Sequence, residues 1–165
     1  MMEMEQRFHL PYNQKGQRRM KNARHLLEEF TASSFRDPRK AAEMFAEDGA
    51  FEMPYLESLG IPWRYAGRKE VEGFFKYVRG LYPNMEFHDV QVVCETPDVV
   101  VGEYELTTPS SKTGRMIHHL FVGRLEARNG QIGLLRESIN LLELGLAIYP
   151  NGLADYKVPE SRDRR

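Results

Sequence analysis

The segment GQIGLLRESINLLELG, residues 130–145, carries Arg136 and Glu137 side by side within an apolar run. Adjacent side chains of a β-strand point to opposite faces of the sheet. If the segment is a strand, the two charged groups cannot pair with each other, and each needs its own partner. Leu135, Glu137 and Ile139 share the more apolar face. We therefore expect Glu137 to point into the interior and Arg136 to point outward, toward a cross-strand acid or a partner subunit.

The bulk composition suits one globular domain. The chain has 165 residues, of which 41% are hydrophobic and 28% charged, and its net charge is −1. Nothing in this balance favours a nucleic-acid partner. The single cysteine, Cys94, excludes an intramolecular disulfide and a cysteine metal cluster, which favours a cytoplasmic location. No apolar run approaches the roughly 18 residues of a membrane-spanning helix, so we expect no membrane partner.

The N-terminal segment is locally basic. Residues 7–24 contain six Lys or Arg residues and no acid. Such a run is typical either of an arm that binds nucleic acid or a membrane surface, or of a solvated helix start. We favour the second interpretation. We expect a flexible basic arm over residues 1–16, one domain over 17–148 and a C-terminal tail over 149–165.

Apolar residues recur at helical spacing in the first half of the chain. This spacing predicts three helices, at residues 16–34, 37–49 and 67–83. Asp37 and Pro38 are expected as the N-cap and first residue of the second helix, with Gly49 just past its end. A brief strand ended by Pro54 follows, and then a loop rich in large aromatic residues.

β-Branched and aromatic residues dominate the second half. They predict strands at residues 85–96 and 98–108, and a hairpin over 114–140 that turns at Asn129-Gly130. Helices followed by strands predict an α+β fold. Three helices would cover one face of a curved mixed or antiparallel sheet, which closes into a cone around an apolar pocket.

Glu137 is the first candidate for a functional group in that pocket. A carboxyl group in an apolar hollow is difficult to ionise, so its pKa should rise. A raised pKa prepares a carboxyl group to act as a general acid near neutral pH. The alternative is that Glu137 lies at the mouth of the hollow, is hydrogen-bonded to backbone groups and has no chemical role.

His119 and Tyr104 are further candidates on neighbouring strands. His119 shares the more apolar face of its strand with Phe121, and is either a catalytic base or a hydrogen-bonded core residue. The Tyr104 hydroxyl either reaches the hollow or simply packs in the core. Glu103 would project inward instead if the strand register shifts by one residue.

Large apolar side chains would form the wall of the pocket. At these spacings such residues also serve as ordinary core. The sequence contains no Gly-rich phosphate loop, no Ser-His-Asp order and no spaced set of metal ligands, so we expect neither a cofactor nor a metal site. The candidate ligand-binding residues are Tyr55, Trp63, Phe74, Phe75, Phe121 and Ile139.

Three segments, AAEMFAEDGAFEMPY, AGRKEVEGFFKYVRGLYP and RNGQIGLLRESIN, resemble successive signatures of SnoaL-like proteins in the nuclear transport factor 2-like superfamily. Within that group the chain looks closest to phenazine-biosynthesis A/B-type proteins. Their Arg-Glu-x-x-Asn strand corresponds to Arg136, Glu137 and Asn140. The resemblance implies a cone-shaped α+β domain that is usually dimeric through its sheets. It also implies that Glu137 acts as an acid, as the matching glutamate does in a ketone–amine condensation.

The chain departs from the phenazine-type pattern at two positions. Phe74 stands at about the place of a histidine in the third helix, and Ser138 follows the glutamate where an aromatic residue is common. Two functions remain open. One is a cofactor-free acid–base enzyme, of isomerase, cyclase or condensation type, for an apolar carbonyl-bearing or cyclic metabolite. The other is a non-catalytic ligand-binding or assembly domain. Either function implies a small apolar ligand and a homodimer.

Overall fold

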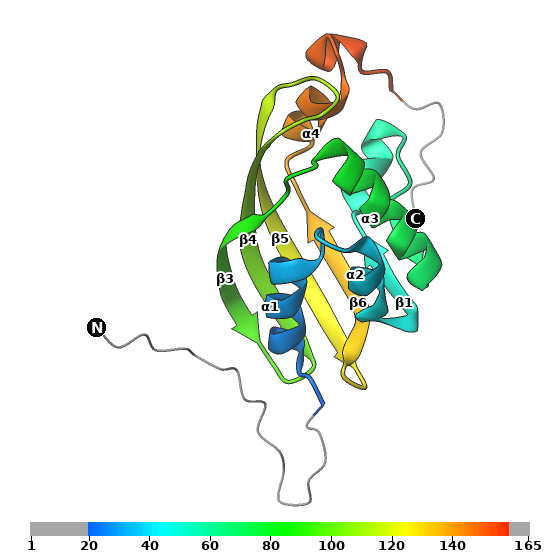
Figure 1. The fold of residues 1–165 in the computed structure, drawn as a ribbon, viewed down its shortest axis with the longest axis vertical. Coiled ribbons are helices and arrows are strands. Elements are labelled where there is room, and N and C mark those ends of the chain that lie inside the picture. The colour runs from blue at the N-terminus through cyan, green and yellow to red at the C-terminus, as the bar shows by residue number, and fades with distance from the viewer. Residues whose placement is uncertain (1–19, 159–165) are drawn as a thin grey trace, which may run out of the picture.

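A computed structural model describes residues 20–158 of the chain, and the predicted arm at 1–16 lies outside these residues. Helices α1, α2 and α3 lie across one face of a curved sheet, and α4 covers one end of it (Figure 1). The elements are α1 (Ala23–Ser33), α2 (Pro38–Glu43), β1 (Phe45–Glu52), the 3₁₀ helix η1 (Pro54–Leu59), β2 (Arg64–Ala66), α3 (Arg68–Leu81), β3 (Phe87–Glu95), β4 (Val99–Pro109), β5 (Met116–Arg128), β6 (Gln131–Ser138), α4 (Leu141–Ile148) and the 3₁₀ helix η2 (Gly152–Asp155).

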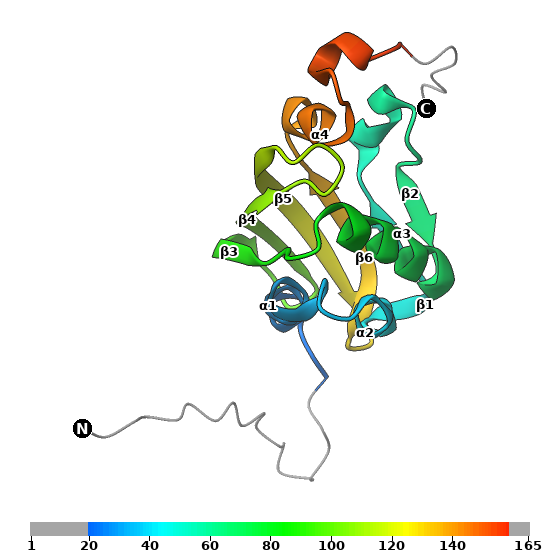
Figure 2. The ribbon, with the colours of Figure 1, turned by 45° about the horizontal axis from the view of Figure 1, so that its top comes forward.

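The sheet has the strand order β2-β1-β6-β5-β4-β3 and remains open between β2 and β3. β1 pairs with β6 in parallel, and the other neighbouring strands pair antiparallel. The second view shows the helices gathered on the concave side of the sheet (Figure 2). The predicted α+β class and the curved mixed sheet with helices on one face are therefore confirmed.

Local signals in the sequence place several element ends correctly. Asp37 Oδ1 accepts hydrogen bonds from the backbone N–H groups of Arg39 (3.1 Å) and Lys40 (3.2 Å), so it caps α2 as expected. Asn129 and Gly130 have φ values of 53° and 76°. Positive φ at both central residues is what a two-residue type I′ hairpin requires, and this turn joins β5 to β6.

The sequence prediction was wrong around Gly49. Helix α2 ends at Glu43, and Gly49 lies inside β1 instead of following a helix. A Cβ atom on Gly49 would lie 2.6 Å from the carbonyl oxygen of Ile132 on β6. Only glycine lets the two strands approach where their register shifts. Parallel pairing with a strand more than 80 residues away determines this segment, and local spacing does not reveal it.

Two further elements were not predicted. Strand β2 lies in the expected loop and pairs with β1 at the edge of the sheet, so the sheet has six strands. Helix α4 follows β6 directly, and Asn140 Oδ1 accepts a hydrogen bond from Leu142 N (3.0 Å) as its N-cap. The apolar residues Leu141, Leu144 and Ile148 have helical spacing, so the sequence did contain a signal for α4.

A basic side chain fixes the C-terminal end of α4. Arg115 donates hydrogen bonds to the carbonyl oxygens of Leu146 (3.0 Å), Tyr149 (2.8 Å) and Pro150 (2.6 Å). The last carbonyl groups of a helix have no hydrogen-bond donors within the helix, and here the guanidinium group of Arg115 supplies the missing donors. Helix α4 is thereby held over one end of the sheet (Figure 2).

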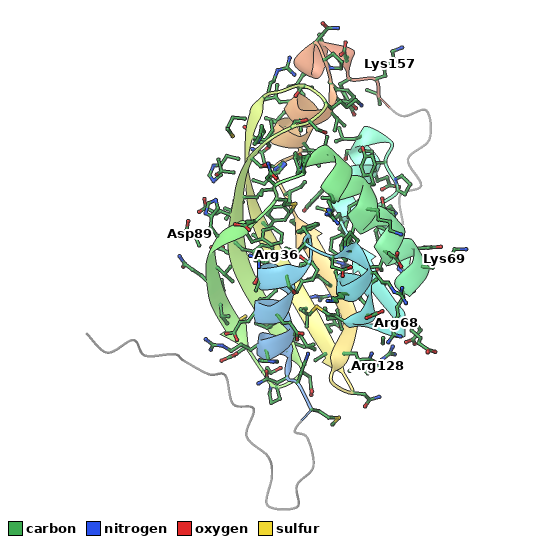
Figure 3. All side chains as sticks on the ribbon, in the orientation of Figure 1. Arg36, Arg68, Lys69, Asp89, Arg128 and Lys157 are labelled. Carbon is green, nitrogen blue, oxygen red and sulfur yellow. The ribbon has the colours of Figure 1, made fainter. Side chains whose placement is uncertain are left out.

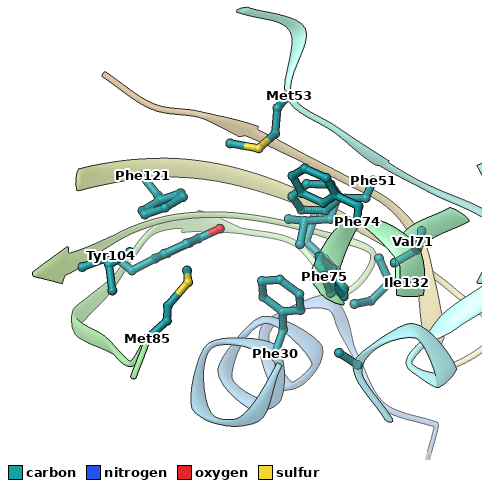
Figure 4. Close-up of a cluster of buried hydrophobic side chains, with 14 of the residues drawn as sticks. Phe30, Phe51, Met53, Val71, Phe74, Phe75, Met85, Tyr104, Phe121 and Ile132 are labelled. Carbon is teal, nitrogen blue, oxygen red and sulfur yellow. The ribbon is translucent and has the colours of Figure 1, made fainter. Parts of the chain in front are cut away.

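An aromatic cluster fills the core between the helices and the sheet. The Phe75 ring, on α3, lies 5.8 Å from Phe30, 6.1 Å from Phe45 and 5.2 Å from Phe51, measured between centroids. Figure 4 shows this cluster beside the Tyr104 and Phe121 rings of the sheet. Within residues 20–158, no helix combines the length and hydrophobicity needed to cross a membrane.

Candidate active site

A small apolar cavity lies between α3, α4, η1 and the concave face of the sheet. Its volume is about 50 Å³, which is room for one or two water molecules. The polar side chains in its wall are Glu137, His119 and two tyrosines. The lining residues are Phe35, Phe51, Met53, Leu56, Ile61, Phe74, Tyr77, Val78, Leu81, Tyr82, Met85, His119, Phe121, Glu137, Ile139, Leu144 and Ile148.

Glu137 enters this cavity from β6 and is only 3% exposed. Its Oε1 atom accepts a short hydrogen bond from the hydroxyl group of Tyr104, which is fully buried on β4. Among residues 20–158, no cationic side chain pairs with Glu137, and no hydrogen bond reaches its Oε2 atom. One carboxyl oxygen is therefore held in place, and the other is available to a molecule in the cavity.

The surroundings of Glu137 favour its protonated form. Burial raises the pKa of Glu137 to about 7, and the hydrogen bond from Tyr104 opposes this rise. Burial also raises the pKa of Tyr104 well above its usual value, and the neighbouring carboxyl group adds to that effect. Tyr104 thus remains a neutral donor, whereas Glu137 can gain or lose a proton near neutral pH.

Gly123 makes the contact between Tyr104 and Glu137 possible. It lies on β5 directly opposite Glu137, between the two strands that carry the pair. A Cβ atom at Gly123 would lie 2.3 Å from the Tyr104 hydroxyl oxygen. The absent side chain leaves the space through which Tyr104 reaches across β5. Gly123 is therefore a positioning residue that sequence analysis did not identify.

His119 supplies a second polar group in the wall of the same cavity. It is 1% exposed, and its Nε2 atom lies 3.2 Å from the hydroxyl oxygen of Tyr82. Burial lowers the pKa of His119 to about 4, although Glu143 opposes this, so the ring is neutral at pH 7. Its Nδ1 atom has no hydrogen-bond partner among the described residues. If Tyr82 donates to Nε2, the Nδ1–H group is an unused donor.

The predicted pocket residues divide into two groups. Phe74, Phe121 and Ile139 line the cavity. Phe75 does not, because the next position on α3 turns its ring into the aromatic core. Tyr55 is 59% exposed. Trp63 lies outside the cavity, in a surface groove beside Arg64 and Arg136. Tryptophan emission therefore does not report directly on the cavity.

Several lining residues were missed by sequence reasoning. Tyr82 follows the last residue of α3 and was considered only as part of the helix end, yet it contacts His119. Leu144 and Ile148 come from α4, which was not predicted. Met53 and Met85 have no periodic pattern that marks them as lining residues. Their positions depend on how η1 and the loop after α3 pack on the sheet.

Arg136 pairs with an acidic residue on the outer face of the sheet. Glu52 on β1 lies directly beside Arg136 in the parallel register. Arg136 Nε donates to Glu52 Oε2 (2.7 Å), and Arg64 Nε donates to Glu52 Oε1 (2.9 Å). The expectation that a cross-strand acid pairs with Arg136 is confirmed. Arg136 and Glu137 thus serve opposite faces of one strand.

One group of side chains outside the cavity could hold a metal ion. His88, Asp89 and Glu105 each offer one ligand atom, and these atoms all lie within 4.8 Å of one another. The group lies on β3 and β4, on the face opposite to Glu137. Sequence spacing did not suggest it, because the strand pairing and an irregularity in β3 bring the residues together.

Comparison with known proteins agrees with the geometry. The SnoaL-like domain family matches residues 23–133. No curated protein matches the chain. Similar solved structures include a candidate isomerase from Bacillus subtilis (23% identity, TM-score 0.68, covering 76% of this chain and 91% of that one). They also include a phenazine biosynthesis-related protein from Pseudomonas aeruginosa (18% identity, TM-score 0.66, covering 87% of this chain and 90% of that one). A third is a candidate polyketide cyclase from Xanthomonas campestris pv. campestris (21% identity, TM-score 0.62, covering 74% of this chain and 93% of that one). At these identities the structural similarity concerns the fold alone.

Proposed function

Because this chain belongs to the SnoaL-like domain family, we propose that its cavity is the active site of a cofactor-free acid–base enzyme. The reaction would be of the isomerase, cyclase or condensation type, on an apolar carbonyl-bearing or cyclic metabolite. One observation carries the proposal. A carboxyl group with a pKa of about 7 lies in an apolar cavity, and among residues 20–158 it accepts one hydrogen bond, from a neutral hydroxyl group, and pairs with no cation.

Glu137 is proposed to move the proton through its Oε2 atom. As a carboxylate it removes a proton from the carbon next to the substrate carbonyl, and as an acid it returns that proton to the same or a neighbouring position. Tyr104 keeps its hydrogen bond to Oε1 in both states, so it stabilises the transient carboxylate and fixes the orientation of the group. A pKa near the ambient pH suits a group that must act in both directions.

His119 is proposed to bind a substrate oxygen. The Tyr104 hydroxyl is already used by Glu137, whereas Nδ1 of His119 has no partner among the described residues. A neutral imidazole N–H is a suitable donor to a carbonyl oxygen. His119 and Glu137 line the same cavity, so the donor and the carboxyl group would act on one bound molecule.

Substrate entry requires the cavity to widen. Pockets for small molecules usually occupy roughly 300–1,000 Å³, far more than the 50 Å³ of this cavity. The wall near α4 and η1 is lined by apolar residues such as Leu144 and Leu56, and Met53 and Met85 can change conformation at small cost. We propose that the ligand enters by displacing these side chains while Arg115 keeps the end of α4 anchored.

The test is a panel of aromatic and polyketide-like ketones, first ranked by the rise in melting temperature and then followed by NMR in D₂O. Proton abstraction exchanges the hydrogen next to the carbonyl for deuterium, so this assay needs no knowledge of the product. Glu137→Gln keeps the shape of the side chain but removes its proton. It should retain the thermal shift and lose exchange by ~100-fold or more. Undiminished exchange in this variant would remove the catalytic assignment.

The small volume of the cavity favours a second candidate, a ligand-binding domain without turnover. The same experiment separates the two functions. Ligands that raise the melting temperature of the wild type but show no deuterium exchange at any position would support binding alone. His119→Phe should then weaken binding, whereas Glu137→Gln should leave it nearly unchanged.

We further propose a homodimer that packs through the outer face of the sheet, in the reducing cytoplasm that suits the exposed Cys94. Met116, Leu120 and Val122 on β5 are 66%, 47% and 41% exposed on that face. A row of exposed apolar residues favours association. Light scattering should give twice the chain mass of 19.2 kDa, and Leu120→Asp should reduce it to that of one chain. A wild-type mass of one chain would contradict the dimer.

A further inference from the structure

Two neighbouring strands bring an imidazole and two carboxyl groups together on the outer face of the sheet. His88 on β3 and Glu105 on β4 are direct cross-strand partners, and Asp89 follows His88 in the chain. Side chains of directly opposed residues are about 5 Å apart at their Cβ atoms. One potential ligand atom from each of the three residues lies within 4.8 Å of the other two.

An irregular backbone at Asp89 makes this convergence possible. In a regular strand His88 and Asp89 would point to opposite faces. Asp89 has a φ of 50°, in the left-handed region, and the register with β4 shifts between His88 and Gln91. The Asp89 carboxylate therefore turns back to lie 2.7 Å from His88 Nδ1. Asp89 projects at the outer edge of the sheet, where an ion can reach it from solvent (Figure 3).

The charges of the group are not balanced by the protein. Within residues 20–158, no Lys or Arg pairs with Asp89 or Glu105, and their only close charged or titratable partners are histidines. Glu105 Oε2 lies 2.6 Å from His118 Nε2, an arrangement that orients the carboxylate from outside the group. One divalent cation would neutralise the charge of the two carboxylates.

We propose that His88, Asp89 and Glu105 bind a divalent transition-metal ion of the Zn²⁺ class, with His118 as a positioning residue for Glu105. Bonds of about 2.0–2.2 Å from nitrogen and oxygen to zinc place ligand atoms roughly 3.3 Å apart, so small side-chain rotations close the site. The imidazole ligand favours such ions over Mg²⁺ and Ca²⁺, which prefer oxygen alone. The site is on the opposite face of the sheet from Glu137 and is independent of its proposed chemistry. Glu105 is the cross-strand partner of Leu120, and β3 is the edge strand of the sheet. The site therefore lies at the β3 edge of the face proposed for the dimer, and zinc binding is measured on the protein in its own oligomeric state.

The test is isothermal titration of the tag-free full chain with Zn²⁺ and, separately, with Mg²⁺. One zinc ion should bind per chain, and Mg²⁺ should bind far more weakly. His88→Gln and Glu105→Gln should each weaken zinc binding by about 10-fold or more, and His118→Gln by a smaller factor. The matched control is Glu103→Gln, which removes the same charge two residues away on the same strand and face and should leave zinc binding unchanged. His25→Gln, on α1, is the control for the histidine change.

Substitution with Co²⁺ adds a readout of the ligands themselves. The visible absorption of bound Co²⁺ should change in His88→Gln and remain unchanged in His25→Gln. Equal zinc affinity in the wild type and in both ligand variants would overturn the proposal. So would the absence of detectable zinc binding by the wild-type chain. One ion per two chains would also overturn it, since the ion would then bridge two copies.

Discussion

Two glutamates of this protein are equally buried and have opposite surroundings. Glu52, on the outer face, is 5% exposed and lies between the guanidinium groups of Arg64 and Arg136. Glu137, on the inner face, is 3% exposed and receives one hydrogen bond, from the neutral Tyr104. The strands that carry them are neighbours in the sheet. Burial alone therefore does not determine what a carboxyl group does.

The side chains that contact each buried carboxyl group determine its role. Arg64 and Arg136 both donate hydrogen bonds to the Glu52 carboxylate, so its role is to join β1, β2 and β6 on the outer face. In the part of the chain that the structure describes, Glu137 pairs with no cation, and its pKa of about 7 leaves it able to exchange a proton. The adjacent Arg136 does not change this, because the alternation of the strand sends it to the other face.

The largest expected effect is on the pH dependence of stability. The folded pKa of Glu137, about 7, exceeds its unfolded value of 4.5, so the native state holds an extra proton between these values. The free energy of unfolding should fall with rising pH over this range, by up to about 3 kcal/mol, compared with that of Glu137→Gln. Urea unfolding of both proteins from pH 4 to 8 measures the difference. In the control variant Glu52→Gln, the free energy of unfolding should fall with rising pH over this range as it does in the wild type.

A smaller effect is expected from Gly123→Ala. The added methyl group would displace the Tyr104 hydroxyl from Glu137, and overpacking of this kind destabilises by about 2 kcal/mol. The comparison variant is Gly133→Ala on β6, where the nearest atom to an added Cβ lies 3.4 Å away. Thermal unfolding of the two variants should differ clearly. Equal destabilisation would mean that the space at Gly123 is not specific to Tyr104.

The smallest effect is expected from removing the charge of Glu52 on the outer face of the sheet. Arg64 and Arg136 are half exposed, so Glu52→Gln should lower the free energy of unfolding by about 1 kcal/mol. Salt screens interactions at exposed cations, and the difference from wild type should therefore shrink in 1 M NaCl. The difference caused by Glu137→Gln should be insensitive to salt, because no cation pairs with Glu137 within the described residues. Urea titrations at low and high salt make the comparison.

Much of the sheet and its orientation could be predicted because the signals are local. The alternation in β6 was enough to place Glu137 inward and Arg136 outward, and the Asn129-Gly130 turn fixed the hairpin that presents them. In β4 and β5 the same alternation placed Tyr104 and His119 inward, where both are buried. A period of two residues is visible in the sequence itself.

The remaining features depend on contacts between distant segments. The role of Gly49 follows from the carbonyl of Ile132, and that of Gly123 from a tyrosine hydroxyl that crosses a strand. Trp63 was expected in the pocket because of its size, but its position was determined by the pairing of β2 with the edge of the sheet. The hydrogen bond from Tyr104 to Glu137 joins residues 33 positions apart, so no local pattern reveals it.

Both the proposed role of Glu137 and the pH dependence of stability require that Glu137 holds a proton in the folded protein near neutral pH. A ¹³C NMR titration of the glutamate carboxyl groups measures this directly, with the Glu137 signal assigned by its loss in Glu137→Gln. We expect a Glu137 signal that titrates with a pKa of about 7, raised further in Tyr104→Phe because the opposing hydrogen bond is gone. A Glu137 signal that titrates near the ordinary value of 4.5 would contradict this expectation.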